Sequence, residues 1–174
     1  MKMSASLEKA FNAQITLEFE ASLTYRQLAI EVDDMDLPGM AAWLRHQADE
    51  EIVHANKFID HLSDRGNHAA IGSIAAPKVK GGSVQAVFEA ALAHEQKVSE
   101  SIRELYRSAE KEGDLDSRPL LSWFLSEQVE EESTVDEILG RIKLIDNDGP
   151  GLLRLDDEMA TRPVATTENT SGPA

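Results

Sequence analysis

The sequence predicts an all-α protein: a four-helix bundle with one long crossover between its second and third helices and a short fifth helix at the C-terminus. Apolar residues recur at three- and four-residue spacing in four long runs, and no strand-like alternation bounded by turns interrupts them. Residues 66–82 (GNHAAIGSIAAPKVKGG) separate the second run from the third. A link of this length suits a crossover that joins two parallel neighbouring helices at opposite ends.

Start and stop signals set the limits of each helix. The first long helix is entered at Ser6, a residue type that caps helix N-termini, and Pro38 suits the first turn of the second. Gly66 and Gly113 follow the second and third runs, where glycine commonly ends a helix. The long helices are therefore predicted over about residues 7–32, 38–65, 84–113 and 117–146.

The C-terminal part contains one more predicted helix. Gly149, Pro150 and Gly151 form a cluster that we expect to break the chain. A short amphipathic helix should follow from about Leu152 to Met159. Residues 162–174 are rich in Thr, Pro, Gly and Ser, so we divide the chain into one domain, residues 1–161, and a flexible tail, residues 162–174.

Composition restricts the classes of function. The 174 residues include no cysteine, which excludes disulfides, thiolate metal sites and cysteine nucleophiles. With 17 Lys and Arg against 32 Asp and Glu, the formal net charge is −15, so nucleic acid is an unlikely partner and cations are favoured. The first residues, MKMSASLEKAF, contain no apolar run of signal-peptide length, and no stretch is long enough to span a membrane. We therefore expect a cytoplasmic protein without a membrane partner.

Each apolar stripe carries a glutamate near its midpoint, and these residues form the candidate functional site. In an antiparallel bundle the helix midpoints meet at one height, so the four carboxylates should converge in the interior, with a histidine one turn from the second of them. These residues are Glu18, Glu51, His54, Glu95 and Glu131. Four buried carboxylates repel one another unless protons or cations compensate them. An oxygen-rich set with one imidazole suits iron or manganese.

The simpler interpretation is that a single Glu on an apolar stripe reaches solvent. Four at matching heights are hard to explain that way, and Glu51-x-x-His54 places both groups on one helix face. A second acidic cluster, Glu50, Glu127 and Glu130, could hold a third metal or be a solvated face.

Two aromatic residues lie near the predicted site. Tyr25 lies two turns beyond Glu18 on the same stripe, and Trp123 precedes Phe124. Each is a candidate to hydrogen-bond a ligand or to supply an electron, although core packing is the simpler role for Trp123. Glu110, Asp114 and Asp116 near the turn before the fourth helix are candidates for an ion channel or for an ordinary polar turn, and the turn is the stronger interpretation.

The motifs of the four helices together resemble those of the non-haem bacterial ferritins. The matching segments are QITLEFEASLTY, ADEEIVHA, HEQKVSESI and SWFLSEQVEEES, and the similarity covers roughly residues 5 to 160. Bacterioferritins differ, because their fourth helix has a second E-x-x-H where this chain has Thr134. Their haem-ligating Met is replaced by Ile52, so the resemblance implies no haem. Animal ferritins carry acidic channel residues where this chain has Arg118 and Leu121.

The resemblance implies a ferritin-like fold and a set of iron ligands. One site would use Glu18, Glu51 and His54; the second would use Glu51, Glu95 and Glu131, with Glu51 bridging and Gln128 close by. A third would use Glu50, Glu127 and Glu130, with Glu131 as a shared ligand. The catalytic set is then Glu18, Glu51, His54, Glu95, Glu131, Tyr25 and Gln128.

The implied function is iron storage with ferroxidase activity: Fe(II) is oxidised by O2 at a di-iron site, and Fe(III) mineral is deposited inside a homo-oligomeric shell of 24 subunits. Two alternatives remain at this point. One is a di-iron oxidase or peroxidase of the same superfamily without a storage role, and the other is a metal-free bundle with an acidic face. Fe(II) and O2 are the substrates on the favoured interpretation.

Overall fold

The structure, a computed structural model, describes residues 1–79, 81–146 and 148–161, and contains five helices and no strand within them. They are α1 (Ala5–Asp33), α2 (Pro38–Asp64), α3 (Val84–Glu112), α4 (Arg118–Ile145) and α5 (Gly149–Thr161). The all-α prediction with its short fifth helix is therefore confirmed. None of these helices combines the length and the hydropathy that crossing a bilayer requires. The predicted tail, residues 162–174, lies outside the described residues.

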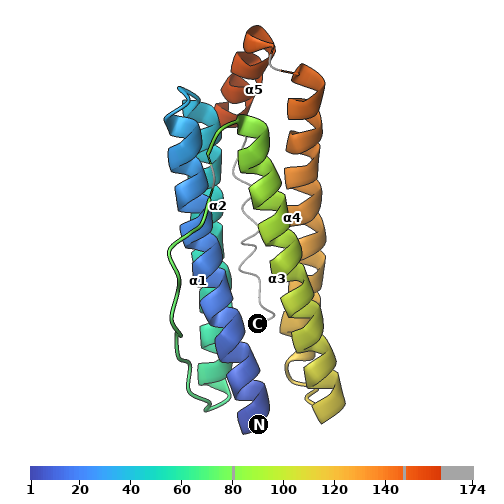
Figure 1. The fold of residues 1–174 in the computed structure, drawn as a ribbon. Helices are drawn as coiled ribbons and strands as arrows, with labels where there is room; N and C mark the ends of the chain where they lie inside the picture. The colour runs from blue at the N-terminus through green and yellow to red at the C-terminus, as the bar shows by residue number, and fades with distance from the viewer. Residues whose placement is uncertain (80, 147, 162–174) are drawn as a thin grey trace.

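The four long helices form a bundle of two antiparallel pairs, α1 with α2 and α3 with α4 (Figure 1). The crossover runs back along α1 and is tied to it: Asn12 Nδ2 donates to the His68 carbonyl at 3.0 Å, and Gly72 N donates to Thr16 Oγ1 at 2.8 Å. As predicted, α2 and α3 run parallel. They are not neighbours, however: in the described part of the chain the α3 backbone lies beside α1 and α4. The parallel pair therefore lies diagonally across the bundle. The helices in each adjacent pair, α1 with α2, α3 with α4 and α1 with α3, run antiparallel (Figure 1).

The first helix starts two residues earlier than predicted. Ser4, in extended conformation, accepts the Leu7 amide N–H on its side chain at 3.1 Å and is the N-cap. Ser6 instead lies inside the helix and donates to Glu112 Oε1 at 2.6 Å. The sequence offered two serines of equal capping ability, and both hydroxyls donate to Glu112. What separates them is the extended backbone at Ser4, which brings its side chain to the Leu7 amide. Directly after Glu112, Gly113 ends α3 in the left-handed region, with φ of 70°, as predicted.

The last helix also starts earlier than predicted, at Gly149. The chain reverses just before it, where Asp146 adopts a left-handed conformation with φ of 43°. Asp148 then accepts the Gly151 amide N–H at 2.8 Å, so its side chain caps the first turn. Pro150 fits that turn because its missing N–H has no partner to lose there. The predicted break therefore lies before the Gly-Pro-Gly cluster, and the cluster forms the first turn of α5.

The fifth helix packs against the start of α2 and caps it. The residue before α2, Leu37, has no side-chain acceptor, and the buried carboxylate of Asp156 supplies two: it accepts Gly39 N at 3.1 Å and Met40 N at 2.7 Å. A Cβ at Gly39 would lie 2.0 Å from the Asp156 carbonyl oxygen, so only glycine allows this approach. Residues more than a hundred positions apart therefore complete one helix terminus.

Replacing Asp156 with alanine should destabilise the metal-free protein by about 1–2 kcal/mol, because two amide N–H groups at the start of α2 lose their acceptor. Thermal unfolding followed by circular dichroism would measure the loss, which corresponds to a melting temperature lower by roughly 2–8 °C. Asp157→Ala is the matched control, since its side chain is exposed on the same helix. Equal melting temperatures for the two variants would contradict the assigned cap.

The apolar interior is divided into two clusters, one at each end of the bundle. One gathers around Leu28, Met40, Phe88 and Ile138, and the other around Phe11, Phe58, Ile102 and Phe124. Between them, at mid-height, lies a layer of buried polar side chains from all four long helices. The fold thus supports a polar centre by closing it above and below with apolar packing.

Candidate metal centre

The polar layer contains the five residues that the stripes singled out. Glu18 comes from α1, Glu51 and His54 from α2, Glu95 from α3 and Glu131 from α4; none exposes more than 8% of its surface. Each predicted midpoint glutamate therefore points into the bundle. Because unpaired carboxyl groups are rarely buried, their convergence requires compensation by protons or cations.

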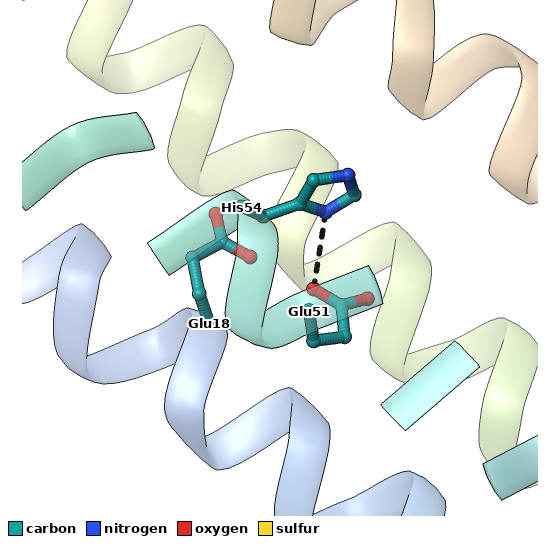
Figure 2. A group of neighbouring side chains, drawn as sticks. All are labelled: Glu18, Glu51 and His54. Atoms are coloured by element: carbon teal, nitrogen blue, oxygen red, sulfur yellow. Dashed lines mark hydrogen bonds and ion pairs between the residues drawn. The ribbon is translucent and has the colours of Figure 1, made fainter. Parts of the chain in front are cut away.

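Two groups of these side chains are close enough to share an ion. Glu18, Glu51 and His54 each offer one ligand atom within 4.8 Å of the others (Figure 2). His54 Nδ1 lies 3.3 Å from Glu51 Oε2, close to the separation of two atoms bound to one small divalent ion. A second group joins His54 with Glu127 and Glu131. His54 belongs to both groups, so the two lie side by side.

Glu95 lies in the same layer but belongs to neither of those two groups of described residues. Its carboxylate is instead held from two sides. Tyr25, fully buried, donates its hydroxyl to Glu95 Oε1, and Gln128 Nε2 donates to Oε2 at 3.1 Å. Both Tyr25 and Gln128 were singled out from sequence, and the structure places each in contact with a glutamate of the centre.

Sequence reasoning assigned no role to two further glutamines, Gln14 and Gln47. Gln14 Nε2 donates to Glu18 Oε1 at 2.7 Å, and Gln47 Nε2 donates to Glu131 Oε2 at 3.0 Å. Both are buried. The available signal was a glutamine four residues before a stripe glutamate, and it occurs at both positions. The partner of Gln47 lies on another helix, which that spacing does not reveal.

The predicted third cluster is more dispersed than the central layer. Glu127 is buried and lies with His54 and Glu131. Glu130 is exposed, and Glu50 is half-buried with His46 Nδ1 3.5 Å from its Oε2. A third ion bound by Glu50, Glu127 and Glu130 stays a prediction.

Burial and mutual repulsion dominate the electrostatics of the centre. Burial, and then the neighbouring Glu51, raises the pKa of Glu18 well above its usual range. The pKa of Glu51 is raised by burial and by Glu95, and that of Glu131 by burial, Glu95 and Glu51. Glu18 Oε2 is also one of two buried side-chain atoms without a hydrogen-bond partner in the described part of the chain. A divalent cation would neutralise these carboxylates and occupy the free oxygen, so the residues fit an iron site.

Aromatic rings close one side of the centre. The His54 ring meets Phe124 edge-on, with centroids 5.5 Å apart, and Trp123 at 5.7 Å. Phe124 stacks on Phe58 at 4.1 Å. The Lys57 ammonium lies 4.8 Å from the centre of the Trp123 ring. This packing fixes the plane of the imidazole and agrees with the simpler, structural interpretation of Trp123.

The acidic residues near the α3–α4 turn are paired within the subunit. Asp114 binds Arg65 at 2.6 Å, Asp116 binds the N-terminal ammonium of Met1 at 3.2 Å, and Glu110 lies 3.4 Å from Arg118. Paired carboxylates are poor candidates for an open ion channel, because their charge is already balanced. The contacts favour the polar-turn interpretation of these residues.

Comparison with known proteins gives consistent matches. The model of the ferritin-like domain family matches residues 8–145. A bacterial non-haem ferritin of Staphylococcus haemolyticus is 37% identical over 160 residues, which cover 92% of this chain and 96% of that protein. One from Escherichia coli is 33% identical over 150 residues, covering 86% and 91%. The open-pore ferritin of the archaeon Archaeoglobus fulgidus has a TM-score of 0.90 at 34% identity, covering 93% of this chain and 99% of that one.

These matches extend over the four long helices that carry the buried centre. The identity exceeds 30% over most of the chain in both bacterial relatives, and the relatives are matched over nearly their full length. The archaeal protein shares the fold at a similar identity. The chain therefore belongs to the ferritin family.

Proposed function

We propose that this ferritin oxidises Fe(II) with O2 in the polar layer of the bundle and stores the Fe(III) product inside a shell of 24 copies of itself. The observation that carries the proposal is the layer itself: four glutamates and one histidine from four helices, enclosed by two apolar clusters. Without cations this arrangement is electrostatically unfavourable. Fe(II) is the substrate that its oxygen-rich donor set accommodates.

The residues divide into two Fe(II) sites that share Glu51. Glu18, Glu51 and His54 would bind one ion, and their ligand atoms already lie within 4.8 Å of one another. Glu51, Glu95 and Glu131 would bind the other. Binding there requires the Glu95 carboxylate to exchange a hydrogen bond from Tyr25 or Gln128 for the ion. Glu50, Glu127 and Glu130 would form a third, adjacent site.

The protein promotes oxidation by geometry and charge. Two ions about 3.5–4 Å apart can each give one electron to the same O2 molecule, which with two protons from solvent leaves as hydrogen peroxide. Carboxylates stabilise Fe(III) more than Fe(II), because hard anionic oxygens favour the higher charge. The Tyr25 hydroxyl donates a hydrogen bond to Glu95 and orients that carboxylate. No side chain acts as a nucleophile.

The storage part of the proposal rests on the family and on charge. The excess of 15 negative charges is available to attract ferrous ions and to hold ferric product. Closed symmetric assembly would enclose the mineral and is the common route to large homo-oligomers. The bacterial non-haem ferritin of Staphylococcus haemolyticus aligns with this chain over 96% of its own length, which supports a shared mode of assembly.

Ferrous ion added under argon, followed by air, tests the proposal. The protein should bind at least two Fe(II) per chain, and ferric absorbance should then appear much faster than in buffer alone. Gel filtration should place the protein at the mass of 24 chains of 19.1 kDa each. Elution as a dimer with intact iron oxidation would favour the oxidase alternative, and iron oxidation no faster than in buffer would refute the centre.

A further inference from the structure

Three buried glutamines each donate one hydrogen bond to a different carboxylate of the centre. The pairs are Gln14 with Glu18, Gln47 with Glu131, and Gln128 with Glu95, at 2.7, 3.0 and 3.1 Å. A neutral amide donor can orient a carboxylate without adding charge, and it leaves the second oxygen available. Gln14 forms the shortest of these three contacts, and its amide oxygen has a partner of its own.

Ser101 on α3 determines which way the Gln14 amide faces. Its hydroxyl donates to Gln14 Oε1 at 2.6 Å. Because the amide oxygen accepts from Ser101, the amide nitrogen must face the other way, toward Glu18. Ser101 is half-buried at the contact between α3 and α1, outside the layer of glutamates. The order of donors is therefore Ser101 to Gln14 to Glu18.

This chain of hydrogen bonds makes the two oxygens of Glu18 unequal. Oε1 accepts from Gln14, whereas Oε2 is buried and has no hydrogen-bond partner. Glu18 thus keeps one buried oxygen without a hydrogen bond, and its carboxylate offers a ligand atom within 4.8 Å of those of Glu51 and His54 (Figure 2). A carboxylate that is already oriented loses less conformational freedom when it binds an ion.

We infer that Gln14, oriented by Ser101, is a positioning residue for Fe(II) binding and oxidation, because it fixes Glu18 with one oxygen directed at the metal site. The inference rests on the proposed function, and it assigns to Gln14 no contact with iron. On this inference the reaction also depends on Gln14 and Ser101, and Ser101 lies on a helix face outside the centre.

A purely structural role for the Gln14–Glu18 pair is the competing explanation. Glutamine and glutamate four residues apart on a helix often pair for stability alone, and Gln27 with Glu31 does so here at 2.8 Å on the same helix. That pair is partly exposed and has no third partner among the hydrogen bonds of the described residues. It therefore provides a matched control with the same residue types, spacing and helix.

Calorimetric titration with Fe(II) under argon separates the two explanations. Gln14→Leu should weaken binding of one of the two Fe(II) ions by about 10-fold or more, with the other less affected, as for the loss of other partners that orient metal ligands. Ser101→Ala should weaken the same ion in the same direction but by less, since the amide can still turn toward Glu18. Ser101→Thr keeps the hydroxyl and should restore binding.

Gln27→Leu and Ser108→Ala are the controls, since Ser108 donates only to the backbone of its own helix. Neither should change Fe(II) affinity. Equal affinities for Gln14→Leu and Gln27→Leu, with both proteins folded by circular dichroism, would overturn the inference. So would a Ser101→Ala variant that binds as tightly as Ser108→Ala, a result that stands even if Gln14→Leu does not fold. If the unsubstituted protein binds no Fe(II), the proposed function fails instead.

Discussion

Replacing Glu131 with alanine should abolish the fast oxidation of Fe(II), with the initial rate falling by more than about 100-fold. Glu131 is the contribution of α4 to the centre and lies with His54 and Glu127. Without it the second Fe(II) loses a carboxylate, and one ion alone cannot pass two electrons to O2. The loss should exceed the 10- to 100-fold typical of residues that merely orient a ligand. Stopped-flow absorbance after mixing with aerated Fe(II) measures the rate.

The same substitution should leave the metal-free protein as stable as before, or more stable. Burial and the neighbouring Glu95 and Glu51 raise the pKa of Glu131, so the folded protein loses a repelling group. The hydrogen bond from Gln47 is lost as well, which offsets part of this gain. Glu137→Ala is the control, because Glu137 is exposed on the same helix. A Glu131→Ala protein that unfolds without metal, or oxidises iron at the normal rate, would contradict the assignment.

The metal-free protein should become less stable as the pH rises from about 6.5 to about 8. Burial raises the pKa of Glu18, Glu51, Glu95 and Glu131. In this range the folded chain therefore holds protons that the unfolded chain has released. Stability falls with pH wherever the folded state binds more protons. Each unit by which one folded pKa is raised costs about 1.4 kcal/mol once both states are ionised, so the melting temperature should fall by at least about 3 °C.

Other acidic groups act in a different pH range. Side-chain hydrogen bonds lower the pKa of Glu8, Glu100 and Glu112, all of them exposed. Their contribution is complete above the unfolded pKa of about 4.5 and is lost only as the pH falls below it. They cannot produce a fall above that range. Burial lowers the pKa of His61 and lowers that of His94 to about 4, so these histidines make stability rise with pH up to about 6.5, and a fall above pH 6.5 comes from the buried carboxyl groups.

A redox-inactive divalent ion provides the control for this pH effect. Saturating Zn(II) binds deprotonated carboxylates and the neutral imidazole, so binding releases protons and strengthens with pH. The melting temperature should then hold steady or rise over the interval in which that of the metal-free protein falls. A metal-free melting temperature that rises between pH 6.5 and 8 would mean that the central carboxylates are ionised and compensated within the protein.

The helices and the central glutamates were predictable because one periodicity determines both. A residue on the apolar stripe faces the core, so Glu18, Glu51, Glu95 and Glu131 had to meet once the stripes were placed. Local end signals were less informative where two residues compete. Ser4 and Ser6 are chemically equivalent caps, and both contact Glu112 on α3, so only the backbone conformation at Ser4 separates them.

Contacts between helices that are distant in the chain could not be predicted from the local sequence pattern. The diagonal position of α2 and α3 depends on which faces pack, and a crossover of that length permits either arrangement. Asp156 reads as an ordinary polar residue of a short helix, and its role as a cap depends on the approach of Gly39. Likewise Ser101 is one serine among several on α3, and only the geometry pairs it with Gln14.

The interior consists of two apolar clusters with a layer of buried carboxyl groups between them, and this division has a consequence for how the subunit binds iron. Each end is packed by its own aromatic and aliphatic contacts, so we expect the bundle to keep its form when iron binds. Arriving ferrous ions have only to displace protons from acids that are already assembled. Iron binding should therefore relieve the repulsion between the central carboxylates, and we expect no rearrangement of the backbone.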